Sequence, residues 1–127
     1  MFRNGIDLVE VDRIRKSCEN PAFLSRVFGA RERAEFSAYK QPYTHIAGAF
    51  AAKEAFSKAL GTGLRGFSLC EVEVLHDNFG APYLSLSGTA AALAKEKNLA
   101  FALSITHTDS IAAAVVTAYP KGDAETL

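Results

Sequence analysis

The chain has 127 residues, of which 49% are hydrophobic and 22% charged, and this composition is typical of one globular domain over residues 1–127. Fourteen basic side chains balance fourteen acidic ones, so the molecule lacks the overall positive charge on which nonspecific nucleic-acid binding depends. Its apolar runs are shorter than the ~18 residues of a membrane span, and its first residues, MFRNGID, do not resemble a secretion signal. We therefore expect a cytoplasmic protein that binds neither nucleic acid nor membranes.

The N-terminal half of the sequence predicts one strand followed by helices. A short β-branched run over residues 5 to 11 is typical of a strand and carries Asp7 near its start. Pro21 and Pro42 interrupt the apolar pattern that follows, because proline has no amide hydrogen for a helix interior. The apolar periodicity around these breaks predicts four helices, over residues 12 to 18, 23 to 28, 30 to 39 and 44 to 60.

The C-terminal half predicts two hairpins and one helix. Apolar and polar side chains alternate over residues 72 to 74 and 84 to 86, and the turn sequence NFG lies between these runs. An alanine-rich helix and a second pair of strands, joined at the turn TDS, are expected over residues 88 to 98, 101 to 105 and 111 to 119. This order predicts an α+β domain with helices packed on a largely antiparallel sheet. We expect the polar residues 121 to 127 to form a flexible tail.

The glycine-rich sequence GTGLRG, residues 61 to 66, has some likeness to a dinucleotide-binding fingerprint. Such a fingerprint needs its glycines between a strand and the next helix, so that the helix N-terminus receives the pyrophosphate. Here the glycines follow a predicted helix and precede a strand, which excludes a Rossmann site. We expect Gly61 and Gly63 to end the helix, with backbone amides that a phosphate could approach.

The long helix carries polar side chains among its alanines and phenylalanines. At about 100° per residue, four residues fall on one face close to the apolar stripe: Glu54, Ser57, Lys58 and Gly61. One interpretation is an ordinary surface pair of Glu54 and Lys58, which stabilises a helix by about 0.2–0.5 kcal/mol. The flanking Phe50 and Phe56 instead predict partial burial, where an unpaired charge is costly.

Positive charge gathers in one part of the chain. Residues 13 to 33 have a net charge of +4, which leaves −4 elsewhere, and their basic members are Arg13, Arg15, Lys16, Arg26, Arg31 and Arg33. A basic face of this kind could bind an acidic partner. It could equally be the solvated surface of helices.

Four segments together resemble the holo-[acyl-carrier-protein] synthases, the short bacterial type of 4′-phosphopantetheinyl transferase. They are GIDLVEVDRI at residues 5 to 14, FAAKEAFSKALGTG at 50 to 63, GAPY at 80 to 83 and SITHT at 104 to 108. The resemblance covers essentially the whole chain, in family-like order and spacing. The segment at 50 to 63 is the specific one, since the two shortest segments alone would carry little weight.

The resemblance implies a Mg²⁺-dependent enzyme that transfers the 4′-phosphopantetheine group of coenzyme A to a serine of an apo acyl carrier protein. Adenosine 3′,5′-bisphosphate would be released, and the reaction would serve fatty acid or polyketide biosynthesis. Two alternatives stay open: a module that binds coenzyme A or a carrier without turnover, and a Mg²⁺-dependent phosphohydrolase.

The resemblance also implies the 4′-phosphopantetheinyl transferase fold and a cyclic homotrimer, with coenzyme A in clefts between neighbouring protomers. The strands at 101 to 105 and 111 to 119 are apolar beyond simple alternation, which agrees with a second buried face. A helix at 88 to 98 could also cover that face.

Roles for residues of the reaction centre follow from the same resemblance. Asp7 and Glu54 match the family's metal ligands, and Mg²⁺ favours such carboxylate oxygens. Lys58 matches a lysine that contacts phosphate, and Ser57 could hydrogen-bond to the same group. The general base stays open between Glu54, a metal-bound water and His107, which could instead contact a phosphate of coenzyme A.

The expected coenzyme A site extends to further residues. Beside Lys58 and Ser57 it includes Gly61, Gly63, Arg65, Pro82 and His107, with the region of Pro82 or His107 supplied by the next protomer. The family commonly has basic residues where this chain has Ala49 and Ala81. The contact to the 3′-phosphate of coenzyme A is therefore expected to fall to Arg65 or another basic residue.

The expected carrier-docking site lies in the basic segment. Arg13 matches an arginine by which the family docks its carrier, and Arg15 and Arg26 lie near it in the sequence. Acyl carrier proteins are small and acidic, so this interpretation fits the local positive charge.

Overall fold

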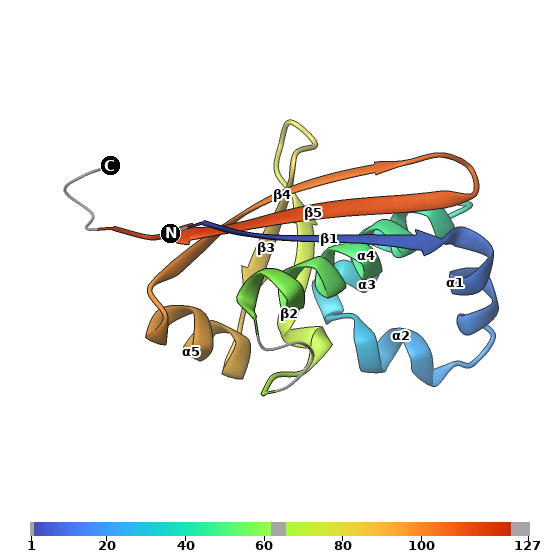
Figure 1. Ribbon diagram of the computed structural model, residues 1–127. Coiled ribbons are helices and arrows are strands. Elements are labelled where there is room, and N and C mark those ends of the chain that lie inside the picture. Colours follow the sequence, from blue (N-terminus) through green and yellow to red (C-terminus); the bar gives the residue numbers. More distant parts are fainter. Residues whose placement is uncertain (1, 62–65, 123–127) are drawn as a thin grey trace.

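The computed structural model describes residues 2–61 and 66–122, and it contains a three-stranded sheet with helices on one side (Figure 1). The strands are β1 (Arg3–Glu10), β5 (Ile111–Pro120) and β4 (Leu99–His107), in the order β1-β5-β4. Both pairs are antiparallel, and Asp7 lies opposite Ala114, which in turn lies opposite Ile105. β1 is therefore an edge strand whose side chains alternate between the helix-covered face and the other face.

The long helix α4 (Tyr43–Leu60) is the central element of the helical layer (Figure 1). Its small residues let it lie close to β1 and β5, and five alanines are fully buried: Ala47, Ala51, Ala52, Ala55 and Ala59. Gly5 of β1 is required at this contact, because a Cβ atom there would collide with the carbonyl oxygen of Ala55. Gly61 ends the helix with a φ of 85°, a left-handed conformation that glycine adopts without strain.

The remaining elements pack around α4 and the sheet. Three short helices precede α4, namely α1 (Val11–Ser17), α2 (Ala22–Val27) and α3 (Ala30–Phe36). A 3-10 turn, η1 (Leu69–Glu71), leads into a separate antiparallel pair, β2 (Val72–His76) and β3 (Pro82–Leu86). Helix α5 (Gly88–Glu96) packs against β4 and η1. Across the described residues, we find no helix with the length and apolarity needed to cross a membrane.

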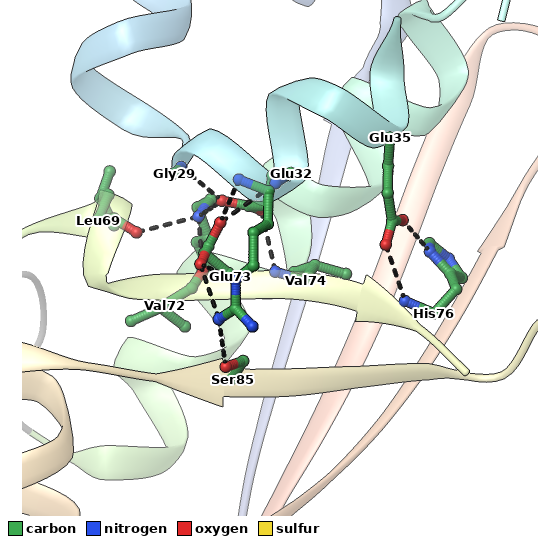
Figure 2. Close-up of polar contacts among 11 residues, drawn as sticks. Gly29, Glu32, Glu35, Leu69, Val72, Glu73, Val74, His76 and Ser85 are labelled. Atoms are coloured by element: carbon green, nitrogen blue, oxygen red, sulfur yellow. Dashed lines mark hydrogen bonds and ion pairs between the residues drawn. The ribbon is translucent and has the colours of Figure 1, made fainter. Parts of the chain in front are cut away.

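A buried ion pair ties α4 to α3 and β2 (Figure 2). Lys53 Nζ lies 2.7 Å from Oε1 of Glu32, and it also donates to the carbonyl oxygens of Leu69 and Val72 at 3.0 and 2.5 Å. Both side chains are fully buried. Burial lowers the pKa of Lys53, and the neighbouring carboxylate of Glu32 opposes that shift. Lys53, which belongs to the motif at residues 50 to 63, is therefore a residue of the core.

The structure confirms the α+β class and the expected helices and strands, with ends shifted by a few residues. The expectation of a single sheet is corrected, because β2 and β3 pair only with each other. Figure 2 shows the edge of β2 that faces α3, where the N–H groups of Val74 and His76 donate to the carboxylates of Glu32 and Glu35. On the other side of this pair, β3 packs beside β4 without joining its sheet.

The expected flexible tail at residues 121 to 127 lies mostly outside the described residues. Its first residue is held in place, since the backbone N–H of Lys121 donates to the carbonyl oxygen of Asn98 at 2.9 Å.

Candidate active site

Three predicted site residues meet where β1 runs alongside α4. Lys58 donates from Nζ to Oδ1 of Asp7 at 3.2 Å and to the carbonyl oxygen of Ile6 at 2.9 Å. Glu54 lies one turn earlier on the same side of α4 and is half-buried. The partial burial expected for this helix face is confirmed. Lys58 forms its ion pair with Asp7, and the surface pair with Glu54 is not formed.

The electrostatics of the site indicate that the two carboxylates share one region of space. Burial raises the pKa of Glu54, and the negative charge of Asp7 raises it further. The positive charges of Lys58 and Arg13 oppose this rise in pKa. Two neighbouring carboxylates are stabilised either by sharing a proton or by a cation between them.

The donor set of this site fits Mg²⁺. This ion takes hard oxygen ligands and is usually held by one or two carboxylates together with phosphate oxygens and waters. Among the residues that the structure describes, no group of three or more His, Cys, Asp or Glu side chains forms a closed metal cage. Asp7 and Glu54 would supply two carboxylate ligands, and the remaining positions would be left to a substrate and solvent.

The other predicted residues of α4 have mainly structural partners. Ser57 is 2% exposed, and its hydroxyl donates to the carbonyl oxygen of Glu54 at 2.7 Å, so a phosphate contact would require that hydrogen to turn outward. The backbone N–H of Gly61 donates to the carbonyl oxygen of Ser57 at 3.1 Å and closes the helix. Gly63 and Arg65, expected near phosphate groups, lie outside the described residues.

A second candidate region is a cleft of about 210 Å³ between the first half of α4, α3 and the ends of β2, β3 and β4. His107 and Pro82, both predicted for the coenzyme A site, line this cleft, and so does Ala49. His45 and His76 line it as well, although neither residue was predicted from the sequence. Sequence reasoning missed them because the three histidines are far apart in the chain and fit no spacing rule.

The cleft and the carboxylate site lie on opposite sides of α4. At 3.6 residues per turn, His45 and Glu54 point about 180° apart. In the sheet, Asp7 belongs to the edge strand β1 and His107 to the opposite edge strand β4, with β5 between them. One protomer therefore groups Asp7 with Glu54 and Lys58, and it keeps His107 and Pro82 apart from them.

Two of the predicted carrier-docking residues are available at the surface. Arg13 is exposed on α1, close enough to the carboxylate site for its charge to act on Glu54. Arg26 of α2 lines a surface cleft together with Lys16. Positive charge therefore lies next to the candidate reaction centre.

Other basic residues of the segment are already paired. Arg15 forms an ion pair with Asp12, and its guanidinium lies 4.9 Å from the ring centroid of Tyr43. Arg31 lies 3.0 Å from Oε1 of Glu73 and is bound to the fold by it. The basic surface is thus narrower than the charge count of the sequence indicates.

The face of the three-stranded sheet that points away from α4 bears no helix in the described chain (Figure 1), and it carries exposed apolar side chains. Ile6 and Leu8 are 65% and 68% exposed, and Val115 is 37% exposed. Because Ile6 and Leu8 alternate with Asp7 along β1, they point away from α4. Exposed apolar patches of this kind are characteristic of interfaces between proteins.

Comparison with known proteins places this arrangement in one family. The model of the 4′-phosphopantetheinyl transferase superfamily matches residues 3–116. The holo-[acyl-carrier-protein] synthase of Caldanaerobacter subterraneus subsp. tengcongensis is 46% identical over 116 residues, covering 90% of this chain and 91% of the relative. That of Thermoanaerobacter sp. is 42% identical over 127 residues, covering 97% of this chain and 92% of the relative.

Solved structures agree with the sequence matches. The holo-[acyl-carrier-protein] synthase of Neisseria meningitidis has a TM-score of 0.85 and 32% identity, covering 92% of this chain and 97% of that chain. That of Bacillus anthracis, in complex with CoA (3′,5′-ADP), has a TM-score of 0.80 and 34% identity, covering 93% of this chain and 96% of that chain. By sequence and by fold, the chain therefore belongs to the 4′-phosphopantetheinyl transferase superfamily, among the holo-[acyl-carrier-protein] synthases.

Proposed function

We propose that this chain transfers the 4′-phosphopantetheine group of coenzyme A to a serine of an apo acyl carrier protein, in a Mg²⁺-dependent reaction that releases adenosine 3′,5′-bisphosphate. The observation that carries the proposal is the meeting of Asp7, Glu54 and Lys58 at one edge of the sheet. Membership of the family supports the same reaction, and the Bacillus anthracis relative is a complex with CoA.

The reaction exchanges one oxygen for another at the phosphorus next to the pantetheine. The serine oxygen forms a bond to this phosphorus, the bond to the bridging pyrophosphate oxygen breaks, and the nucleotide leaves with that oxygen. Lys58 would donate to the phosphate oxygens and stabilise the charge that develops on the leaving group. Mg²⁺ held by Asp7 and Glu54 would supply further charge neutralisation.

The serine must also lose its proton, and two side chains of this protein are candidates to accept it. Glu54 is one, because its carboxylate lies in the same site as Asp7 and Lys58. His107 is the other, and it would have to come from a neighbouring protomer, since it lies across α4 and the sheet from Glu54.

The complete site, in this proposal, forms between protomers of a homotrimer. A ligand that touches both Lys58 and the cleft of His107 must span opposite sides of α4, and two neighbouring chains can present these sides to each other. The exposed Ile6, Leu8 and Val115 supply an apolar surface for that contact. The cleft of one protomer would take the nucleotide end of coenzyme A, and the carboxylate site of the next would take the pyrophosphate.

The carrier would dock on the basic surface of α1 and α2. Arg13 lies nearest to the carboxylate site, and Arg26 and Lys16 extend the positive surface away from it. An acidic carrier attracted to this surface would bring its serine toward the reacting phosphorus.

The test is to incubate the protein with coenzyme A, Mg²⁺ and an apo acyl carrier protein, and to weigh the carrier by mass spectrometry. The proposal expects carrier that is heavier by one phosphopantetheine, formed only when Mg²⁺ is present. Free phosphopantetheine with unmodified carrier would instead show a phosphohydrolase. Binding of coenzyme A without either product would show a binding module.

A further inference from the structure

The chain contains three histidines, and all three line the same cleft: His45 from α4, His76 from the end of β2 and His107 from the end of β4. No lysine or arginine is found among the described residues that line it. The other titratable groups on its wall are the carboxyl group of Glu35 and the phenol of Tyr39. Any positive charge contributed by these lining residues therefore has to come from protonated imidazole.

The contacts of His76 leave Nε2 as the nitrogen whose hydrogen-bonding role depends on protonation of the ring. Its Nδ1 lies 2.8 Å from Oε1 of Glu35, and its backbone N–H donates to Oε2 of the same carboxylate (Figure 2). A carboxylate can only accept, so Nδ1 carries a hydrogen in this contact. Nε2 is then a bare acceptor in the neutral ring and an N–H donor in the charged ring.

His107 and His45 complete the group. Nδ1 of His107 lies 3.2 Å from the carbonyl oxygen of Thr108, which likewise leaves Nε2 to respond to protonation. The His45 ring is stacked on Tyr39 with centroids 3.8 Å apart, and its centroid lies 6.2 Å from that of His107. Burial lowers the pKa of His45, and positive charge on His107 and on His76 lowers it further. Without an anion in the cleft, the three rings therefore resist being charged together.

We propose that His45 and His76 act with His107 as the phosphate-recognising residues of this cleft, so that the 3′-phosphate of coenzyme A is bound together with protons. The inference rests on the proposed function, because coenzyme A is the ligand that brings a phosphate monoester to the cleft. It goes further, since it assigns recognition to two residues of this chain and makes recognition depend on pH.

The sign of the pH dependence follows from the charges. A phosphate dianion favours imidazolium over imidazole, so binding takes up protons and weakens as the pH rises above the ordinary histidine range near 6.5. Below about pH 6 the phosphate monoester itself becomes protonated, and the advantage stops growing. The carboxylate of Glu35, whose Oε1 lies 2.8 Å from Nδ1 of His76, offsets part of the charge of a protonated His76.

The experiment compares coenzyme A with dephospho-coenzyme A, which lacks only the 3′-phosphate, by isothermal titration calorimetry at pH 6.5 and pH 8.5. We define the ratio as the affinity for coenzyme A divided by the affinity for dephospho-coenzyme A. This ratio should be about tenfold or more larger at pH 6.5 than at pH 8.5, since hydrogen bonds from charged donors are the stronger ones. Measurements in two buffers of different ionisation enthalpy should show that coenzyme A takes up more protons than dephospho-coenzyme A.

Two variants assign the effect to residues. His45→Gln and His76→Gln keep a polar side chain that cannot be charged, so each should lower the ratio at pH 6.5 and leave the affinity for dephospho-coenzyme A nearly unchanged. A ratio independent of pH, or a ratio that neither variant lowers, would overturn the inference. If the wild-type protein still modified the carrier, the proposed function would stand even though the inference about the histidines had failed. If the protein bound neither coenzyme A nor dephospho-coenzyme A, the proposed function and the inference would both fail.

Discussion

Lys58 Nζ lies 3.2 Å from Oδ1 of Asp7, so an ammonium from the end of α4 and a carboxylate from the edge strand form one polar centre. Sequence places these two residues far apart, and the tight packing of Gly5 against Ala55 is what brings β1 close enough to α4 for them to meet. The charges of Asp7 and Lys58 also act on Glu54, so three groups suited to metal and phosphate chemistry lie together beside a half-exposed surface.

We expect Asp7→Ala and Glu54→Ala each to abolish transfer while leaving the protein folded. Each variant removes one proposed metal ligand and buries no new charge, and an ion pair as exposed as that of Lys58 with Asp7 contributes about 1 kcal/mol or less to stability. Initial rates at limiting Mg²⁺ and the midpoint of thermal unfolding provide the measurement. Glu10→Ala, which removes an exposed carboxylate from the same strand, is the matched control. Near-normal rates in either site variant would refute the metal assignment.

Lys58→Ala should lower kcat/KM for coenzyme A by about 10²-fold or more, because the lysine stabilises charge that develops on the leaving nucleotide. The Mg²⁺ concentration for half-maximal rate should change much less, since both carboxylates remain. Lys95→Ala removes an exposed lysine near the end of α5 and should match the wild type. An unchanged kcat/KM in the Lys58 variant would mean that this lysine serves only the fold.

Charge reversal at Arg13 should raise the KM for the carrier several-fold and leave the affinity for coenzyme A unchanged. The exposed arginine provides attraction at long range, so added salt should weaken carrier binding by the wild-type protein as well. Steady-state kinetics of Arg13→Glu at low and high salt measure both effects, and Lys95→Glu controls for the change in net charge. Carrier kinetics that do not respond to salt would count against docking on this surface.

Lys53→Met should destabilise the protein by about 3–5 kcal/mol, because it leaves the fully buried carboxylate of Glu32 without its ion partner. The double variant with Glu32→Gln should recover part of this loss, since neither charge then remains in the core. Chemical denaturation of the two single variants and the double variant measures the coupling. Additive losses would show that the pair does not act as a unit.

The sequence predicted the elements well because their signals are local. Prolines and glycines bound the helices, and alternation over a few residues marks the strands that became β2 to β5. It could not predict that Glu32 and Glu35 of α3 bind the N–H groups along one edge of β2, or that β3 packs beside β4 without joining its sheet. Side-chain contacts between residues that are far apart in the sequence produce no periodic pattern from which they could be predicted.

The candidate site, like the fold, could be predicted only in part from the sequence. Glu54 and Lys58 fall on one helix face by spacing alone, and the family resemblance supplied Asp7. Lys53 stands next to Glu54 in the sequence, yet it points into the core, where Glu32 and two carbonyl oxygens surround it. His45 and His76 carry no sequence signal at all, since only the folding of α4 against β2 and β4 gathers them in the cleft.

The central claim is that phosphopantetheine transfer occurs in a site to which neighbouring protomers contribute opposite sides of α4. It is tested most directly by co-refolding Glu54→Ala and His107→Ala in equal amounts, under conditions in which neither variant alone modifies the carrier, and weighing the carrier after incubation with coenzyme A and Mg²⁺. Random assembly gives an intact combination in about a quarter of the clefts of a cyclic trimer, so modified carrier should form at roughly that fraction of the wild-type rate. Mixed trimers that leave the carrier unmodified, or a monomer that transfers at the full rate, would contradict the account.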